Sequence, residues 1–289
     1  MTPELRSALE PVAGQIRDID PVGGGSISAS FRLLSVTGQR FFLKIQPAEQ
    51  ADLFDAEADG LTALADCDCV AVPRPLAGGV VTGQAYLLLD FLDLDGDRDT
   101  AAAELGRRLA EQHRRPAGEF GWPRDNYIGS TPQPNGMNGN WIEFLHDQRL
   151  GYQLELAASN GFGGELQQLG QRLLARLPEF FDELPQPSLL HGDLWGGNWG
   201  ALAGGRPAIF DPAVYLGDRE ADLAMTRLFG GFPDAFYRAY CDAWPLRPGY
   251  ERRQDLYKLY HLLNHLNLFG GGYADSALAC LRRLLRRPG

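Results

Sequence analysis

The first ninety residues alternate between short strand patterns and helical patterns. Apolar and polar residues alternate on both sides of the turn Thr37-Gly38-Gln39, as is typical of an antiparallel hairpin. Gly and Pro separate the apolar runs further on, which indicates turns between elements. We expect the order helix, strand, strand, strand, helix, strand, strand, with helices at residues 4–9 and 48–65 and with strands that include residues 31–36, 40–45, 79–81 and 85–89.

After Asp90 the pattern changes, and helical periodicity dominates most of the remainder. The segment 118–140 is rich in Gly, Pro and Asn, and it predicts a long ordered loop of a kind often used for function. The clearest helical stretches are residues 101–113, with Leu105 and Leu109 inward, and residues 254–268, with Leu256, Leu259, Tyr260, Leu263 and Leu266 on one face.

These patterns predict an α+β fold with two lobes. Residues 1–90 are expected to form a small antiparallel β lobe with a helix, and residues 91–289 a larger, mostly α lobe. A chain of 289 residues is long enough to bury a sizeable core in each.

Composition narrows the classes of function. The net charge of −10 and the pI near 5.0 argue against general binding to nucleic acid or to anionic membranes, so neither is expected as a partner. No apolar run is long enough to span a bilayer, and residues 1–6 lack the pattern of a secretion signal, so we expect a cytoplasmic protein.

Neither the basic tail nor the cysteines of the chain predict a binding site. We expect the arginines of the tail to stabilise the C-terminus of a helix rather than to form a binding patch. They are Arg282, Arg283, Arg286 and Arg287. The four cysteines have no matching histidine cluster, so we expect reduced thiols and no zinc site.

The most informative motif is the run His191-Gly192-Asp193-Leu194-Trp195-Gly196-Gly197-Asn198, followed by a short apolar strand pattern that ends at Asp211. Asp193 and Asn198 have the D-x-x-x-x-N spacing of a kinase catalytic loop, in which a second aspartate completes a Mg²⁺ site. One carboxylate orients the attacking hydroxyl and takes its proton, while an amide oxygen and the other carboxylate bind metal. The spacing predicts Asp193 as catalytic residue and Asn198 and Asp211 as metal ligands, within a protein-kinase-like fold.

Candidate nucleotide-binding residues lie in the first lobe. Gly23-Gly24-Gly25-Ser26 sits between two strand patterns, where glycines let backbone N–H groups approach phosphates. Lys44 alternates outward in its strand and is placed to reach the α/β-phosphates, and Glu57 in the next helix is placed to hold it. Asp90-Phe91-Leu92 falls where a hinge offers backbone groups to adenine. We therefore predict ATP and Mg²⁺ as cofactors.

With these residues placed, the chain resembles the fructosamine/ketosamine 3-kinase family, within the protein-kinase-like superfold that also holds aminoglycoside and choline phosphotransferases. A departure is Ser26, where many relatives carry a cysteine in the phosphate lid, so redox control is not expected. The resemblance covers nearly the whole chain and rests on residues 21–28, 126–135, 191–198, 211–220 and 262–267.

The resemblance implies transfer of phosphate from ATP to the 3-hydroxyl of a ketosamine, small or protein-bound, after which the product releases its amine. It also implies that Asp222 braces the catalytic loop from a helix below, with His191 as a structural support. Asp218 is expected to be an N-cap. Residues expected near the sugar are Trp195, Asn126, Thr131, Gln133 and Asn135, although the last four also suit any ordered loop.

Three alternatives remain open from the residues. A kinase of another hydroxyl substrate, such as an aminoglycoside or choline, shares the nucleotide residues and differs in the acceptor pocket. A silent ATP-binding module is disfavoured because Lys44, Glu57, Asp193, Asn198 and Asp211 are all present. A metallohydrolase lacks a supporting histidine-rich ligand set. The acidic run of Asp93, Asp95, Asp97 and Asp99 is interpreted as a solvated linker.

Overall fold

A computed structural model describes residues 1–23 and 28–286 of the chain. The predicted lid residues Gly24, Gly25 and Ser26, and Arg287 of the basic tail, lie outside the described residues. The first lobe contains α1 (Pro3–Ala13), β1 (Ile16–Val22), β2 (Ala29–Ser35), β3 (Arg40–Pro47), α2 (Ala51–Cys67), β4 (Pro75–Val81) and β5 (Gln84–Asp90).

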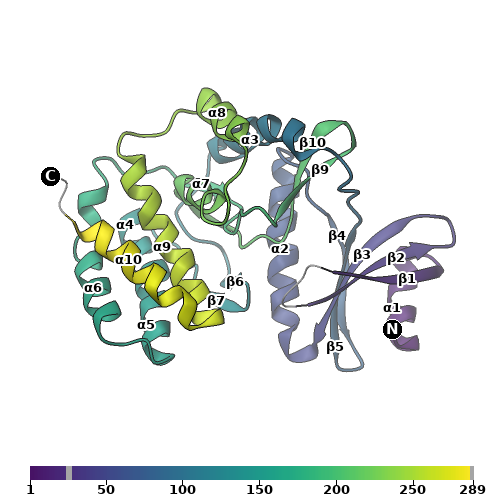
Figure 1. The fold of residues 1–289 in the computed structure, drawn as a ribbon. Coiled ribbons are helices and arrows are strands. Elements are labelled where there is room, and N and C mark those ends of the chain that lie inside the picture. Colours follow the sequence, from purple (N-terminus) through teal and green to yellow (C-terminus); the bar gives the residue numbers. More distant parts are fainter. Residues whose placement is uncertain (24–27, 287–289) are drawn as a thin grey trace.

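The five strands form one antiparallel sheet in the order β1-β2-β3-β5-β4. Side chains alternate between its two faces, so Leu43 packs with Leu5 and Leu9 of α1, while Lys44 lies on the face toward α2. Helix α2 lies between the sheet and the second lobe (Figure 1). The predicted order of elements in this lobe is confirmed.

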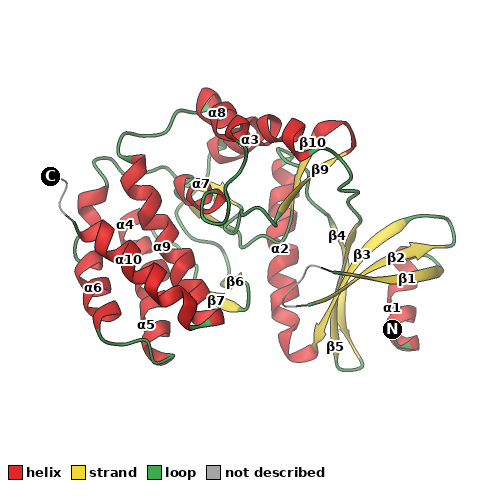
Figure 2. Ribbon diagram, viewed as in Figure 1, coloured by secondary structure: helices red, strands yellow, loops and turns green. Residues whose placement is uncertain are grey.

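The second lobe is mostly helical, as predicted (Figure 2). It contains α3 (Arg98–Arg114), β6 (Asn126–Ile128), β7 (Thr131–Gln133), α4 (Trp141–Leu145), α5 (Tyr152–Ser159), α6 (Glu165–Leu174), β8 (Ser188–Leu190), β9 (Trp199–Leu202), β10 (Arg206–Ile209), β11 (Tyr215–Gly217), α7 (Glu220–Thr226), α8 (Asp234–Ala243), α9 (Tyr250–Phe269) and α10 (Ala274–Leu285).

The strands of this lobe form three small antiparallel pairs, β6-β7, β8-β11 and β9-β10. The pair β6-β7 lies within the segment predicted as a loop, because strands of three residues are too short to show an alternating pattern. The helices predicted at 101–113 and 254–268 are confirmed as parts of α3 and α9, and their predicted inward stripes are buried.

The hydrophobic core crosses the predicted lobe boundary. The sheet ends at Asp90, but Leu61 and Leu64 of α2 pack in one cluster with Leu105 and Leu109 of α3. The predicted boundary between residues 90 and 91 therefore separates the five-stranded sheet from the mostly helical part. It does not separate two independent hydrophobic cores. This shared packing fixes α2 against the second lobe.

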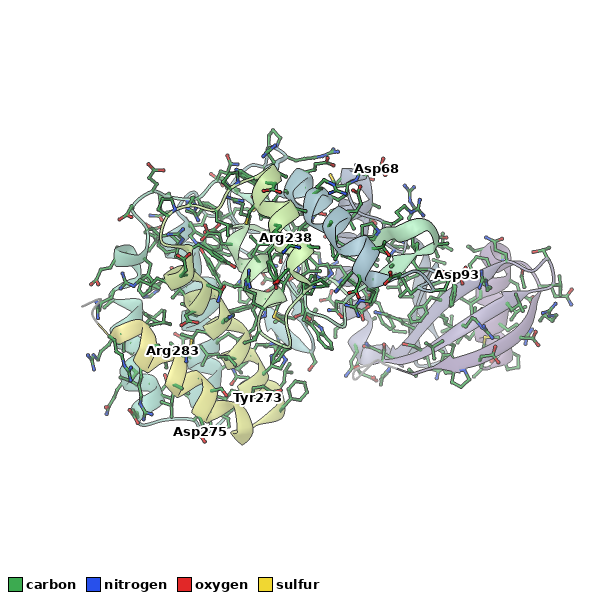
Figure 3. The ribbon with its side chains drawn as sticks, turned by 45° about the horizontal axis from the view of Figure 1, so that its top comes forward. Asp68, Asp93, Arg238, Tyr273, Asp275 and Arg283 are labelled. Carbon is green, nitrogen blue, oxygen red and sulfur yellow. The ribbon has the colours of Figure 1, made fainter. Side chains whose placement is uncertain are left out.

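Two arginines of α10 form ion pairs with acidic residues of α6 and α9. Arg282 pairs with Glu165 at 2.7 Å, and Arg283, on the outer side of the second lobe in Figure 3, pairs with Asp255 at 3.0 Å. No helix within the described part of the chain is long and apolar enough to cross a membrane.

Candidate active site

Lys44 is the centre of an ion-pair cluster between the sheet, α2 and the second lobe. Its Nζ lies 2.6 Å from Glu57 Oε1 and 2.6 Å from Asp211 Oδ1, and only 7% of the residue is exposed. Burial disfavours the ammonium charge, but the carboxylates of Glu57 and Asp211 outweigh burial and raise the pKa of Lys44. The lysine is therefore a fixed cation between the two lobes.

Asp211 follows β10 in a left-handed backbone conformation, with φ of 55°. Such a conformation is unfavourable for a residue with a Cβ and is concentrated at functional positions. The side chain is 49% exposed, so it is accessible to a ligand.

The predicted catalytic loop, residues 191–198, lies beside Asp211. Asn198 directs Nδ2 toward the Asp193 carbonyl oxygen at 2.9 Å and toward Asp193 Oδ2 at 3.3 Å, with the Asp211 carbonyl oxygen at 3.4 Å. Among the hydrogen bonds of residues 1–23 and 28–286, none uses Asn198 Oδ1. This orientation suits Oδ1 for a cation between Asn198 and Asp211.

Asp193 has an electrostatic environment suited to proton transfer near neutral pH. Burial, with the negative charges of Asp211 and Asp222, raises the pKa of Asp193 to about 7, against a smaller opposing effect of the Asn198 hydrogen bond. The carboxyl group thus changes charge in the range where a general base works best.

Asp222 of α7 supports the catalytic loop from below. Its two carboxylate oxygens accept hydrogen bonds from the backbone N–H groups of His191, at 2.8 Å, and Gly192, at 2.9 Å. The His113 Nε2 atom lies 3.1 Å from the same carboxylate. Burial opposes the charge of Asp222, but hydrogen bonds from the His113 side chain and the Gly192 N–H lower its pKa, so it stays ionised. His113 was missed from the sequence, although its spacing from Leu105 and Leu109 places it on the buried stripe of α3.

The His191 side chain supports the same loop. Its Nε2 lies 3.0 Å from the Phe210 carbonyl oxygen and therefore carries the proton, which leaves Nδ1 to accept the Asp193 N–H at 3.3 Å. Burial lowers the pKa of His191, so the ring is neutral. Gly192 has φ of 83°, and a Cβ there would lie 1.9 Å from the Ala213 carbonyl oxygen. Only glycine fits this turn.

Arg98, which sequence reasoning also missed, holds the other end of the loop. Its Nη2 donates to the Gly196 carbonyl oxygen at 2.8 Å, and its guanidinium stacks on Trp199 at 4.2 Å. The preceding linker is fixed to β9 as well, because Gly96 N donates to the Ala201 carbonyl oxygen at 2.9 Å. No motif signals Arg98, because its contacts join segments about a hundred residues apart in the chain.

Trp195 projects from the catalytic loop and is 40% exposed. Its ring packs over Gly197 and against the edge of Phe229, with 6.5 Å between ring centres. The exposed ring beside Asp193 is available to a substrate.

The predicted sugar contacts of the segment 126–135 require correction. Asn126, Gln133 and Asn135 are buried, and their amides bond to protein groups: Asn126 to the Val214 carbonyl oxygen, Gln133 to Asn126 and Asn135 to Asn126. The remaining predicted contact, Thr131, is also buried. These side chains support the segment and are not presented to a sugar.

The predicted nucleotide-binding residues at positions 23 and 90–92 lie at the ends of strands β1 and β5. Gly23 directly follows β1 and is exposed. Asp90 ends β5, and its N–H donates to the Arg74 carbonyl oxygen at 3.0 Å. Phe91 and Leu92 are half-buried at the start of the linker, and Arg40 lies over the Phe91 ring at 5.2 Å.

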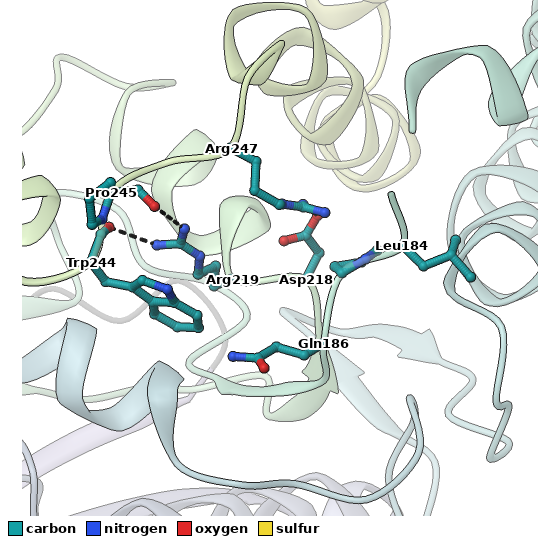
Figure 4. Close-up of a pocket in the computed structure, with 8 residues that line it drawn as sticks. Leu184, Gln186, Asp218, Arg219, Trp244, Pro245 and Arg247 are labelled. Carbon is teal, nitrogen blue, oxygen red and sulfur yellow. Dashed lines mark hydrogen bonds and ion pairs between the residues drawn. The ribbon is translucent and has the colours of Figure 1, made fainter. Parts of the chain in front are cut away.

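The residues near Asp218 line a separate surface pocket of about 320 Å³ (Figure 4). Asp218 accepts the Glu220 N–H at 3.1 Å, but the N-cap of α7 is Arg219, so Asp218 lies one residue before the cap position predicted for it. Arg219 donates to the carbonyl oxygens of Trp244 and Pro245. Asp218 and Arg219 thus bind backbone groups of the second lobe, and they are not part of the ion-pair cluster around Lys44.

The donor set around Lys44 fits a nucleotide with a divalent cation. Carboxylate and amide oxygens are the ligands that Mg²⁺ prefers, and Asp211 and Asn198 present both kinds. Lys44 supplies the positive charge that phosphate oxygens require.

Comparisons with known proteins agree with this arrangement. The fructosamine kinase family model matches residues 4–287. A probable ketoamine kinase of Synechocystis is 43% identical over 273 residues, covering 94% of this chain and 92% of the relative. The chloroplastic protein-ribulosamine 3-kinase of Arabidopsis thaliana is 42% identical over 281 residues, covering 96% and 85%. Among solved structures, a proposed fructosamine-3-kinase of Thermobifida fusca superposes with a TM-score of 0.88 at 31% identity, covering 98% of each chain.

Proposed function

Because this chain belongs to the fructosamine kinase family, we propose that it transfers phosphate from ATP to the 3-hydroxyl of ketosamines. The observation that carries the proposal is that Lys44, Asp193, Asn198 and Asp211 meet at one place between the lobes. The two named relatives support an amine-linked ketose as acceptor, because one is a probable ketoamine kinase and the other a ribulosamine 3-kinase.

In the proposed reaction the nucleotide lies between the sheet and the catalytic loop. Lys44, held by Glu57, binds the phosphates, and Asn198 and Asp211 hold Mg²⁺. When bound, the metal neutralises charge on the phosphate oxygens. Asp193 orients the acceptor hydroxyl and takes its proton. Positioning is expected to dominate the rate, because phosphoryl transfer passes through a loose transition state.

The catalytic loop needs its supports for this role. Asp222 and His191 fix the backbone on both sides of Gly192, so the Asp193 carboxyl group stays at one position relative to Asn198. The exposed ring of Trp195 is proposed to cover the apolar face of the sugar. The phosphorylated ketosamine then decomposes and releases its amine, which would make the protein a deglycating enzyme.

The proposal is tested by measuring ADP release with Mg·ATP on four acceptors: ribulosyl-lysine, fructosyl-lysine, an aminoglycoside and choline. Turnover is expected on one or both ketosamines. Turnover on the aminoglycoside or choline alone would keep the kinase chemistry and overturn the ketosamine assignment. Failure to release ADP with every acceptor, despite Mg·ATP binding, would favour a silent ATP-binding module.

A further inference from the structure

Residues 120–135 belong to the segment 118–140, which the sequence predicts to have a function. None of these residues belongs to the proposed reacting groups, but the segment contacts both sides of the Lys44 cluster. On one side it meets α2, which carries Glu57. On the other it meets residues 213–216, which closely follow Asp211. Strand β6 of this segment lies beside α2 (Figure 1).

Three polar contacts join the segment to α2. Trp122 Nε1 donates to Asp59 Oδ2 at 2.6 Å, Tyr127 Oη donates to Asp52 Oδ2 at 2.9 Å, and Arg124 Nη2 donates to Asp52 Oδ1 at 2.5 Å. Asp52 and Asp59 are separated by seven residues, or about two helical turns, so they lie on one face of α2. Glu57 projects from a different face, toward Lys44.

The opposite contacts are buried. Asn126 Nδ2 donates to the Val214 carbonyl oxygen at 2.6 Å, and Gln133 Nε2 donates to the Ala213 carbonyl oxygen at 3.2 Å. Gly121 and Leu216 exchange two backbone hydrogen bonds, of 2.9 and 2.8 Å. The chain that leaves Asp211 is thus bound to the segment along most of residues 213–216.

The segment is itself held rigidly by the helical lobe. Buried Arg149 donates to Asn135 Oδ1 at 2.7 Å and to the Pro134 carbonyl oxygen at 2.6 Å. Tyr260 Oη of α9 donates to Gln133 Oε1 at 2.6 Å. A buried hydrogen-bond network resists displacement, because opening it would leave further polar groups unpaired.

Helix α2 also touches the chain after Asp211 directly. A Cβ at Gly60 would lie 2.9 Å from Val214 Cγ2, so the absence of a side chain at Gly60 permits close packing. The orientation of Glu57 relative to Asp211 therefore depends on this packing and on the polar contacts of Asp52 and Asp59.

We propose that residues 120–135 form a clamp that fixes α2 relative to Asp211, so that Lys44, Glu57 and Asp211 are arranged before nucleotide binds. Asp52, Asp59, Trp122, Arg124 and Tyr127 are its positioning residues; none of them takes part in the proposed chemistry. The inference rests on the proposed function, since it assigns the clamp a role in binding Mg·ATP.

The test is the double variant Asp52→Ala with Asp59→Ala, which removes the polar contacts to α2 and leaves the buried network intact. Calorimetric titration with Mg·ATP is expected to show an increase in Kd of about fivefold, because the three partly exposed contacts together contribute on the order of 1 kcal/mol. The KM for ketosamine should change by less than about twofold. Asp55→Ala, at an exposed site on the same helix, is the matched control and should bind as wild type does.

A charge exchange supplies the rescue. Asp52→Arg alone should weaken Mg·ATP binding, and Asp52→Arg with Arg124→Asp should restore it in part. If the double aspartate variant does not fold, Trp122→Phe, which keeps the ring packing but loses the indole N–H, carries the same test.

Unchanged Mg·ATP affinity in the folded variants, with wild-type protein that binds Mg·ATP, would overturn the clamp and leave the proposed function standing. An equal rise in the ketosamine KM would also overturn it, because that result indicates general loosening. Failure of wild-type protein to bind Mg·ATP would instead refute the proposed function itself.

Discussion

Lys44 Nζ lies as close to Asp211 Oδ1 as to Glu57 Oε1, at 2.6 Å in each case. The lysine proposed to bind phosphate therefore contacts the carboxylate proposed to bind metal. A cation and a phosphate entering together can satisfy both groups, whereas a cation alone must compete with the ammonium for Asp211.

This contact predicts opposite effects of Lys44→Met on two ligands. Binding of Mg²⁺ alone should strengthen, because the competing ammonium is absent. Binding of Mg·ATP should weaken by about tenfold or more, equivalent to about 1.4 kcal/mol, because a phosphate contact is lost. Calorimetric titrations with MgCl₂ and with Mg·ATP measure both changes. Undiminished Mg·ATP affinity would contradict the role given to Lys44.

The pKa of Asp193, raised to about 7, predicts an acid limb in the pH profile. An aspartate with a raised pKa is protonated below that value and cannot take the acceptor proton. The kcat/KM for the ketosamine should therefore fall as pH drops through about 7, by about tenfold per unit at lower pH. Mg·ATP binding over the same range is the control for nucleotide ionisation. A flat profile between about pH 5.5 and 8.5 would exclude Asp193 as a base of this pKa.

Asp222→Asn should damage both the fold and the loop. An amide cannot accept from the His191 and Gly192 N–H groups at both of its heavy atoms, so one buried donor loses its partner. We expect the free energy of unfolding to fall by about 3 kcal/mol and kcat to fall by at least about tenfold. Denaturant unfolding and steady-state kinetics measure these changes, with Asp242→Asn on exposed helix surface as control. Wild-type stability and rate in the Asp222 variant would count against the brace.

Arg98→Ala should slow the reaction without unfolding the protein. The variant loses both the Gly196 hydrogen bond and the stacking on Trp199, so the catalytic loop is less well held. We expect kcat to fall by about tenfold, with a smaller change in the KM for Mg·ATP. Arg98→Lys should restore only part of the rate, because an ammonium group can donate a hydrogen bond but cannot stack on Trp199 as a planar guanidinium does. Arg107→Ala, on the same helix, is the control; an Arg98→Ala rate equal to it would refute the positioning role.

Site residues that belong to a motif of fixed spacing could be predicted from the sequence, whereas residues outside such a motif could not. Asp193, Asn198 and Asp211 stand at a spacing that few structures other than a phosphotransfer loop require, and the structure brings them together. The amides of Asn126 and Gln133 carry no such constraint, because an amide bonds equally well to a sugar hydroxyl or to a backbone carbonyl.

The fold was more predictable than its contacts between distant segments. Alternation in β2 and β3 and the helical stripe of α9 identify elements locally. The contacts of Trp122 with Asp59 and of Arg98 with Gly196 depend on how the lobes pack, which no local pattern reports.

The most direct test of the central claim is phosphorus NMR of the product formed from Mg·ATP and ribulosyl-lysine or fructosyl-lysine, with wild-type protein and with Asp193→Asn. The variant should fold, because burial disfavours the carboxylate that it removes. We predict phosphate on the 3-hydroxyl with wild-type protein, and a kcat lower by at least about a hundredfold in the variant with nearly unchanged Mg·ATP affinity. Phosphate at another hydroxyl, or an unchanged kcat in Asp193→Asn, would contradict the account.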